Sequence, residues 1–216
     1  MKTHHLKVTR TAHFYTLGEA TDKTKRMWFA CHGYGQLASN FIQKFDRVAG
    51  EEDFVVAPEG LNRFYWGGVA GKPAANWMTS KDRLDEIADY SAMLSTIFEQ
   101  QKALLADDVQ VILFGFSQGS STVIRWMLRA QPSFDHLWIW GGQIPEDVSY
   151  EDVRAEWNTR KIHAFHGTED PFVTPDRHQL LKQYIAESGL NIEEHIYEGD
   201  HRVIREVLDG YRKRLL

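Results

Sequence analysis

The sequence predicts an α/β protein, built as a doubly wound, mostly parallel sheet with helices on both faces. Two observations lead to this fold class. Short apolar runs typical of buried strands alternate along the chain with segments whose apolar residues repeat at helical spacing. The length of 216 residues suits one domain over residues 1–216, and predicted elements fill it so fully that no large cap domain is expected.

Two buried strands are predicted in the first part of the chain. Residues 6–17 alternate between polar and apolar side chains and indicate an outer strand or a hairpin arm. The apolar run 27–31 and the run 54–57, which ends at a proline, are typical of buried strands. Between them, apolar residues repeat at helical spacing over 37–48, and Gly50 is the expected stop.

The middle of the chain is less regular. Residues 59–79 show no clear periodicity and are rich in aromatic side chains, so we expect a long but ordered loop. The clearest helix covers residues 81–105, and its apolar stripe consists of Leu84, Ile87, Ala88, Ser91, Leu94 and Phe98. After an elbow described below, we expect strands over 135–140, 161–165 and 192–197, an irregular acidic stretch after Gly142, and helices over 175–188 and 203–211.

A strand, a sharp turn and a helix are predicted around Gly115-Phe-Ser-Gln-Gly119. In that context the pattern G-x-S-x-G is typical of a nucleophile elbow, whose strained turn holds the serine hydroxyl out above the sheet. Glycine suits both flanks because other backbone comes too close there for a side chain. The bland alternative is an exposed serine in an ordinary turn. We predict that Ser117 is a nucleophile.

A serine hydroxyl needs a histidine to take its proton and a carboxylate to orient that histidine. In a doubly wound sheet both come from loops at the carboxyl ends of later strands, in the order serine, acid, histidine. Asp170 follows the strand predicted at 161–165, and His201 follows the strand predicted at 192–197. The order therefore predicts Ser117, Asp170 and His201 as a catalytic triad.

Other carboxyl groups compete for the role of the acid. Glu169 is adjacent to Asp170, but alternation along an extended turn would direct it the other way. Asp200 is next to His201 and poorly placed to reach its ring. Asp147, after the preceding strand, is a less favoured acid position. A turn-forming role is the alternative for any single aspartate in such a loop.

An oxyanion hole requires backbone N–H groups aimed at the developing negative charge. We expect one donor to be the amide of Gln118, directly after the nucleophile. The second is expected from the loop His32-Gly-Tyr-Gly35 after an early strand, where glycines permit a close approach to substrate, and the Tyr34 amide is the predicted donor. The alternative for this loop is a plain strand-to-helix turn.

Together these pieces resemble the α/β-hydrolase superfamily, and within it the phospholipase/carboxylesterase family that includes acyl-protein thioesterases. The matching stretches are His32-Gly-Tyr-Gly35, Gly115-Phe-Ser-Gln-Gly119, Gly167-Thr-Glu-Asp-Pro-Phe-Val173 and Gly199-Asp-His201. The resemblance implies a serine esterase with the triad and oxyanion amides named above. Gln36 stands where the family often has an acidic residue, and Gly-Asp-His replaces Gly-Gly-His. Both differences, with the aromatic 59–79 segment, weaken any transfer of long-chain acyl-protein or phospholipid specificity.

Aromatic residues near these loops are candidates for the substrate pocket. We select Trp66, Trp77 and Phe172 as substrate-binding residues, with plain loop packing as the alternative. A metal cluster of His163, His166, His195 and Asp170 can be imagined, but its spacing matches no common zinc pattern, so no metal is expected. Cys31, the single cysteine, is expected to be a core thiol.

Composition limits the partners. The net charge of −5 gives no support for nucleic-acid binding or for docking on an anionic membrane. The N-terminus lacks the apolar core of a signal peptide, and no apolar run is long enough for stable membrane insertion. We expect a cytoplasmic enzyme that takes a small-molecule acyl ester and needs no cofactor. The oligomeric state is open, and a homodimer is compatible with the sequence.

These inferences predict a serine carboxylesterase that hydrolyses small to medium acyl esters through an acyl-enzyme intermediate. An acyl thioesterase or a lysophospholipase-like hydrolase with the same triad is the nearest alternative. A non-catalytic binding protein and a peptidase are further alternatives, since one fold can host several chemistries.

Overall fold

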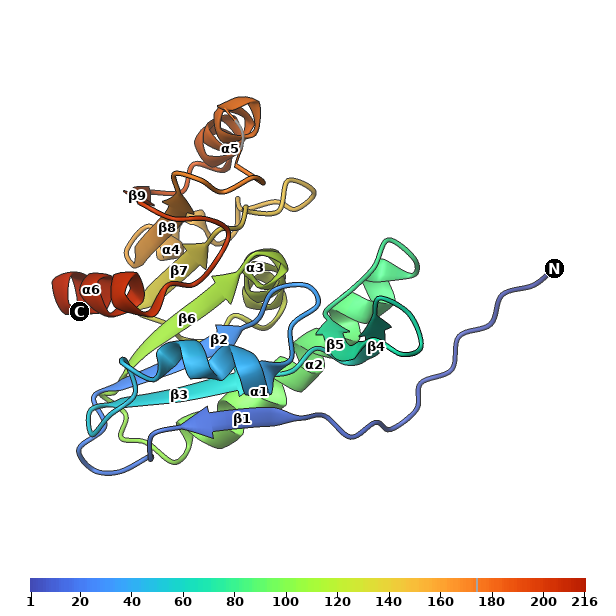
Figure 1. Cartoon of the computed structure of the whole chain (residues 1–216), viewed down its shortest axis with the longest axis horizontal. Coiled ribbons are helices and arrows are strands. Elements are labelled where there is room, and N and C mark those ends of the chain that lie inside the picture. Colours follow the sequence, from blue (N-terminus) through green and yellow to red (C-terminus); the bar gives the residue numbers. More distant parts are fainter. Residues whose placement is uncertain (174) are drawn as a thin grey trace.

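The computed structural model describes residues 1–173 and 175–216 (Figure 1). Its strands are β1 (Phe14–Leu17), β2 (Arg26–Cys31), β3 (Asp53–Pro58), β4 (Asn62–Trp66), β5 (Lys72–Asn76), β6 (Gln110–Phe116), β7 (His136–Trp140), β8 (Lys161–Gly167) and β9 (Ile192–Tyr197). Its helices are α1 (Ala38–Phe41), the 3-10 helix η1 (Ile42–Phe45), α2 (Arg83–Lys102), α3 (Gln118–Ala130), α4 (Arg154–Trp157), α5 (Pro175–Ser188) and α6 (Arg205–Leu215).

The main sheet has the strand order β1-β3-β2-β6-β7-β8-β9. The strand β1 pairs antiparallel with β3 at one edge, and every other neighbouring pair of this sheet is parallel. The central strands are buried along nearly their whole length, as parallel strands are when helices cover both faces. This arrangement confirms the predicted fold class.

Successive side chains of each strand point to opposite faces of the sheet, and each face has its own hydrophobic core. Trp28, Phe114 and Phe165 face α1, η1 and α6. Phe29 and the residues that share its direction face the larger layer formed by α2, α3, α4 and α5, where Trp126 packs tilted against Phe29 with 5.1 Å between ring centroids. The two layers of helices lie on opposite sides of the sheet in Figure 1. Large aromatic side chains fill both cores and fix the spacing of the helices from the sheet.

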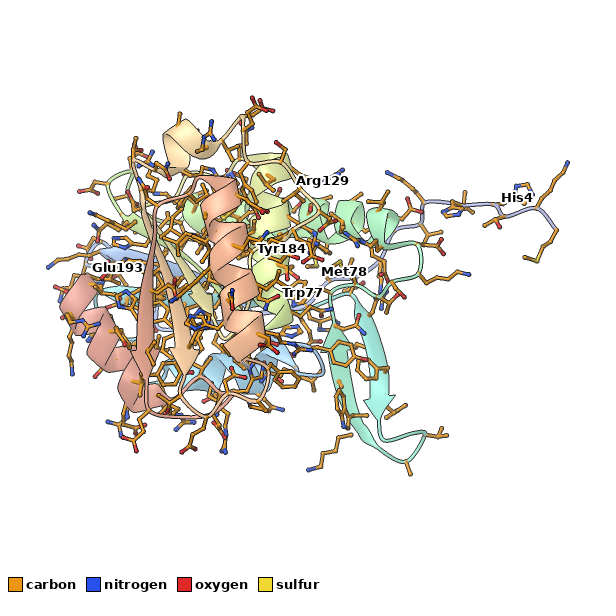
Figure 2. All side chains as sticks on the ribbon, turned by 90° about the horizontal axis from the view of Figure 1, so that it is seen from above. His4, Trp77, Met78, Arg129, Tyr184 and Glu193 are labelled. Carbon is orange, nitrogen blue, oxygen red and sulfur yellow. The ribbon has the colours of Figure 1, made fainter. Side chains whose placement is uncertain are left out.

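The segment 59–79 is not the loop that we expected. It forms an antiparallel hairpin of β4 and β5, in which Asn62 pairs with Asn76 and Trp66 pairs with Lys72. The hairpin stands out from the body of the molecule (Figure 2). Because most side chains of β4 and of the hairpin tip are partly or fully exposed, the sequence lacks the alternation that marks a half-buried strand.

The structure also corrects the bounds of three predicted features. The helix predicted over 37–48 is a short α1 that tightens into η1, which buries Phe41 and Phe45 together. The outer strand is limited to Phe14–Leu17, because only these residues pair with β3, while residues 1–11 are exposed. Leu84 is exposed in the first turn of α2, and the buried stripe begins one turn later at Ile87.

Among the described residues, no helix combines the length and apolar character that crossing a bilayer requires.

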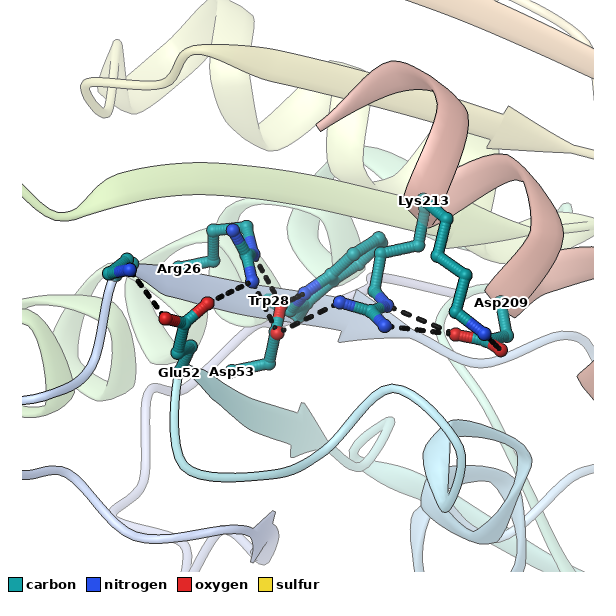
Figure 3. A network of polar contacts seen from close by, with 8 residues as sticks. Arg26, Trp28, Glu52, Asp53, Asp209 and Lys213 are labelled. Atoms are coloured by element: carbon teal, nitrogen blue, oxygen red, sulfur yellow. Dashed lines mark hydrogen bonds and ion pairs between the residues drawn. The ribbon is translucent and has the colours of Figure 1, made fainter.

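A buried carboxylate joins the start of the sheet to the C-terminal helix (Figure 3). Asp53, at the start of β3, accepts hydrogen bonds from Arg26 Nε at 2.7 Å, Arg26 Nη2 at 2.8 Å and the Trp28 indole at 2.9 Å. Arg212 of α6 adds a contact of 3.4 Å to the same carboxylate. Because Asp53 is 3% exposed, these partners replace the water that its charge would otherwise require.

We predict that Asp53→Ala lowers the free energy of unfolding by about 3–5 kcal/mol, because it removes the buried partner of the Arg26 guanidinium and leaves the buried indole of Trp28 without a partner. Glu52→Ala is the matched control. Glu52 also contacts Arg26, but its side chain is 44% exposed, so its loss should cost less than about 1 kcal/mol. Urea unfolding of both variants measures the difference, and equal losses would contradict this role of Asp53.

Two buried histidines are held in their neutral form. His32 follows β2 and accepts a hydrogen bond from the Gly60 amide at its Nε2, at 3.0 Å, while its Nδ1 lies 2.8 Å from the Gly33 carbonyl oxygen. Loss of solvation lowers the pKa of His32 to about 4. The pKa of His163, on β8, is also lowered to about 4, first by loss of solvation and then by the neighbouring His195.

Stability should therefore fall on mild acidification. The pKa of His32 in the folded state lies below its value of about 6.5 in an unfolded chain, so the unfolded chain binds the proton first. The stabilisation is complete above pH 6.5 and is lost as the pH falls toward 4. Each of the two histidines should remove about 2 kcal/mol between pH 7 and pH 5. His32→Gln should flatten this dependence in urea unfolding, and an unchanged slope would contradict the assignment.

Candidate active site

Ser117 occupies the turn between β6 and α3 with φ 53° and ψ −118°. This conformation is strained for a residue with a side chain and agrees with the predicted elbow. Two glycines permit it. A Cβ on Gly115 would lie 2.5 Å from the Gly119 carbonyl oxygen, and one on Gly119 would lie 2.2 Å from the carbonyl oxygen of Cys31. The first turn of α3 thus rests directly on the ends of β2 and β6.

Asp170 and His201 form the acid–histidine pair expected from the sequence. His201 Nδ1 lies 2.7 Å from Asp170 Oδ2, and the other carboxylate oxygen accepts the amide of Phe172 at 2.8 Å. The Asp170 side chain has no exposed surface, whereas that of His201 is 18% exposed. The buried carboxylate orients the ring so that Nδ1 donates to it, and Nε2 on the opposite side of the ring remains free to accept a proton.

The two loops that carry this pair are joined to each other. The Thr168 amide donates to the Tyr197 carbonyl at 2.9 Å, and the Glu169 amide donates to the Gly199 carbonyl at 2.8 Å. These bonds continue the pairing of β8 with β9 beyond the strands. The separation between acid and histidine is therefore set by the backbone of the sheet.

The end of β7 links this pair to the serine. The Ser117 amide donates to the Trp140 carbonyl at 2.9 Å. The next residue, Gly141, lies so close that a Cβ there would be 3.3 Å from His201 Nδ1 and 3.4 Å from Asp170 Oδ2. The ring of Phe116, directly before the serine, lies 5.0 Å from the His201 ring between centroids. The turn that carries Ser117 and the loops that carry Asp170 and His201 thus lie at the same carboxyl edge of the sheet.

The competing carboxyl groups lie elsewhere. Asp147 forms ion pairs with Arg83 and Arg125, and Asp200 pairs with Arg202. Although burial opposes it, the Arg125 and Arg83 guanidinium groups hold the pKa of Asp147 below its ordinary value. Glu169 is exposed. Within the described part of the chain, Asp170 is the carboxylate in contact with His201.

The amides of Tyr34 and Gln118, predicted as oxyanion donors, form no hydrogen bond to any described residue. Gln118 is the first residue of α3, where N–H groups have no partner within the helix. The neighbouring amides are engaged: Gly33 N donates to the Gln36 side chain at 2.9 Å, and Gly35 N donates to the Ala75 carbonyl at 2.8 Å. The Tyr34 amide is left available between two anchored neighbours.

Two side chains with structural roles at this site were not identified from the sequence. His32 joins the Tyr34 loop to Gly60 through the two ring nitrogens described above. The Gln118 side chain accepts the Trp77 amide at 3.1 Å and donates to the Met78 carbonyl at 2.9 Å. It therefore connects the first turn of α3 to the segment after β5. No local sequence pattern marks either contact, since each joins residues that are far apart in the chain.

The three predicted pocket residues have different environments. Phe172 is exposed and its ring lies 4.6 Å from that of His201. Trp66 is exposed and covers Gly35, where a Cβ would meet its ring at 2.5 Å. Trp77 is buried, stacks near His32 at 4.8 Å and donates its indole hydrogen to the His32 carbonyl at 2.7 Å. Trp66 and Phe172 can face a substrate, while Trp77 contacts the loop His32–Gly35 through His32.

Cys31 is buried at the end of β2, and burial raises the pKa of its thiol, as expected for a core cysteine. The imagined metal cluster does not form as a group of four. His163 and His195 lie 3.0 Å apart, whereas Asp170 binds His201 and the His166 ring lies nearest to that of His178.

Comparison with known proteins gives a consistent result. Residues 18–215 match the family model described as Phospholipase/Carboxylesterase. None of the curated proteins matches the sequence significantly.

Solved structures with the same fold include an acyl-protein thioesterase 2 from Zea mays, with a TM-score of 0.71 and 15% identity over 95% of this chain and 98% of that one. A carboxylesterase from Mesorhizobium loti gives a TM-score of 0.67 and 15% identity over 94% of each chain. A Bacillus cereus carboxylesterase gives 0.66 and 11% identity over 95% of each. At these identities the structures establish the fold, and the family match establishes the lineage. The chain belongs to the phospholipase/carboxylesterase family of ester-hydrolysing α/β hydrolases.

Proposed function

We propose that this protein is a serine carboxylesterase that hydrolyses small to medium acyl esters through an acyl-enzyme intermediate. The observation that carries the proposal is the buried Asp170 in contact with His201, at the edge where Ser117 is held in a strained turn. A strained backbone and a buried charge both cost stability, so their coincidence at one edge favours a functional site.

In the proposed reaction, Ser117 Oγ attacks the ester carbonyl while His201 Nε2 takes the hydroxyl proton. Asp170 keeps Nδ1 of His201 protonated and stabilises the imidazolium that forms. The amides of Tyr34 and Gln118 donate to the oxyanion. His201 then returns the proton to the leaving alcohol, and water repeats the sequence on the acyl-enzyme to release the acid.

The β4–β5 hairpin supports a role in binding the acyl group. Tyr34, Phe64 and Trp66 form an aromatic cluster with ring centroids 5.5–6.0 Å apart, next to the predicted oxyanion loop. Tyr34 and Trp66 are each about half exposed, which gives an open apolar surface rather than an enclosed tunnel. An open surface favours small to medium acyl groups, since a longer chain would extend into water.

A thioesterase is the second candidate, because the same residues can attack a thioester and one similar fold is that of an acyl-protein thioesterase. Rates on matched oxygen and thiol esters of one acyl group would decide between them. A binding protein without turnover and a peptidase have no supporting observation beyond the fold. The cytoplasmic location and the homodimer stay predictions.

We predict that Ser117→Ala lowers kcat/KM for p-nitrophenyl butyrate by at least about a thousandfold, because the nucleophile is removed while binding surfaces remain. Ser121→Ala, the same substitution one helical turn later, should retain activity within about threefold. A Ser117→Ala enzyme that keeps more than about a thousandth of wild-type turnover would contradict the proposed role.

We predict that Trp66→Ala lowers kcat/KM for p-nitrophenyl hexanoate by about tenfold but changes the acetate rate little, because it removes apolar surface beyond the first carbons of the acyl group. Tyr65→Ala is the control. Tyr65 and Trp66 are 56% and 55% exposed, but only Trp66 joins the cluster at Tyr34. Equal effects of the two variants, or equal losses on both esters, would count against an acyl-binding hairpin.

A further inference from the structure

Three side chains with metal-binding groups converge on one face of the sheet, away from Ser117. The register of β8 and β9 pairs His163 with Glu193 and Phe165 with His195, so His163, Glu193 and His195 project from the same face. His163 Nδ1 lies 3.0 Å from His195 Nε2. One oxygen of the Glu193 carboxylate, Oε2, lies 3.4 Å from His163 Nδ1, and the other, Oε1, lies 3.6 Å from His195 Nε2.

This spacing suits a tetrahedral cation. Zinc binds nitrogen and carboxylate oxygen at about 2.0–2.2 Å, which places neighbouring ligand atoms of a tetrahedron about 3.3–3.6 Å apart. The two ring nitrogens are 3.0 Å apart, a few tenths of an ångström below that range, and each of them lies 3.4–3.6 Å from one of the two Glu193 carboxylate oxygens. With one ligand atom taken from each residue, the three atoms all lie within 4.8 Å of one another. Within the described residues this is the one group of three or more histidine, cysteine or acidic side chains whose ligand atoms lie this close together.

Burial and access also suit a metal. His163 and His195 are 3% and 7% exposed, so both rings are buried beside each other. The Glu193 side chain is 61% exposed and opens the site to solvent on one side.

We propose that Nδ1 of His163, Nε2 of His195 and the Glu193 carboxylate bind one zinc-class divalent cation, with water in the fourth position. Two histidines and a carboxylate suit Zn²⁺, and the order of affinities among divalent metals allows Ni²⁺ or Cu²⁺ to compete. The cation clips the edge strand β9 to β8. These strands lead into the loops that carry His201 and Asp170.

Arg214 of α6 contacts His195 in a way that disfavours metal binding. Its Nη2 lies 3.4 Å from His195 Nδ1 and can donate to it only when Nδ1 lacks a proton. A metal on Nε2 requires the proton on Nδ1, so Arg214 must turn away, and its exposed position on α6 allows this. The contact of Arg214 with His195 Nδ1 thus favours the metal-free form.

The test is calorimetric titration of the full chain, freed of metal by chelation, with ZnCl₂. The exposed residues His4 and His5 could bind zinc themselves, so the titration uses His4→Asn/His5→Asn protein. His4 lies on the extended N-terminal arm, on the far side of the molecule from Glu193, so this change leaves the proposed site intact (Figure 2). We expect one zinc per chain and a higher thermal midpoint with zinc. Glu193→Gln and His195→Gln should each weaken binding at least about tenfold, and Arg214→Gln should strengthen it by about tenfold by accepting the Nδ1 hydrogen.

Glu193→Gln changes an exposed side chain, so its result does not depend on whether His195→Gln folds. His178→Gln is the matched control, because His178 and Glu194 form a separate pair 2.9 Å apart that no third described ligand residue completes. It should leave zinc affinity unchanged. Absence of saturable binding, or binding that survives both Glu193→Gln and His195→Gln, would overturn the proposal.

Discussion

The close contact of α3 with the ends of β2 and β6 is the constraint on which the site depends. Gly115 and Gly119 allow backbone approaches that any side chain would prevent, and the turn between them forces Ser117 to a positive φ. A Cβ at either glycine would have to displace backbone rather than a flexible side chain. The strain at Ser117 is thus imposed by the packing of a helix on a sheet, which also fixes where the hydroxyl starts from.

The other components reach this point through backbone geometry. The loops after β8 and β9 bond to each other, and the end of β7 contacts both the serine turn and the acid–histidine pair. Next to the β4–β5 hairpin, the Gln118 side chain accepts a hydrogen bond from the Trp77 amide, and the Trp77 indole donates to the His32 carbonyl. Movement of the β4–β5 hairpin would therefore displace the loop His32–Gly35 as well as the aromatic cluster of Tyr34, Phe64 and Trp66.

Most of the fold could be predicted from the sequence because parallel strands buried on both faces leave continuous apolar runs. The ranges of β2, β3, β7 and β8 agree with expectation to within two residues for this reason. The ranges of α5 and β9 and the position of Asp170 after β8 also agree with expectation. The β4–β5 hairpin could not be predicted, since its exposed aromatic residues show no alternation. Leu84 matches the helical repeat of α2 but lies beyond the core, which periodicity alone cannot reveal.

The side-chain contacts between distant parts of the chain could not be predicted at all. Gln118 with Met78, and His163 with His195, are separated by tens of residues and meet only through strand register and loop closure. Spacing in the sequence argued against a metal at the histidines, because zinc patterns describe ligands on one local motif and not on two neighbouring strands. The candidate triad could be proposed from the sequence, because the order of its residues along the chain follows from the order of the strands.

The central claim is that Ser117 is the group that becomes acylated. Diethyl p-nitrophenyl phosphate tests it directly, since attack on phosphorus releases p-nitrophenol and leaves a stable diethylphosphoryl serine. Mass spectrometry of peptides should locate one adduct, on Ser117, and His201→Asn protein should form it far more slowly because the proton acceptor is missing. An unmodified protein, or an adduct on a different residue, would contradict the account.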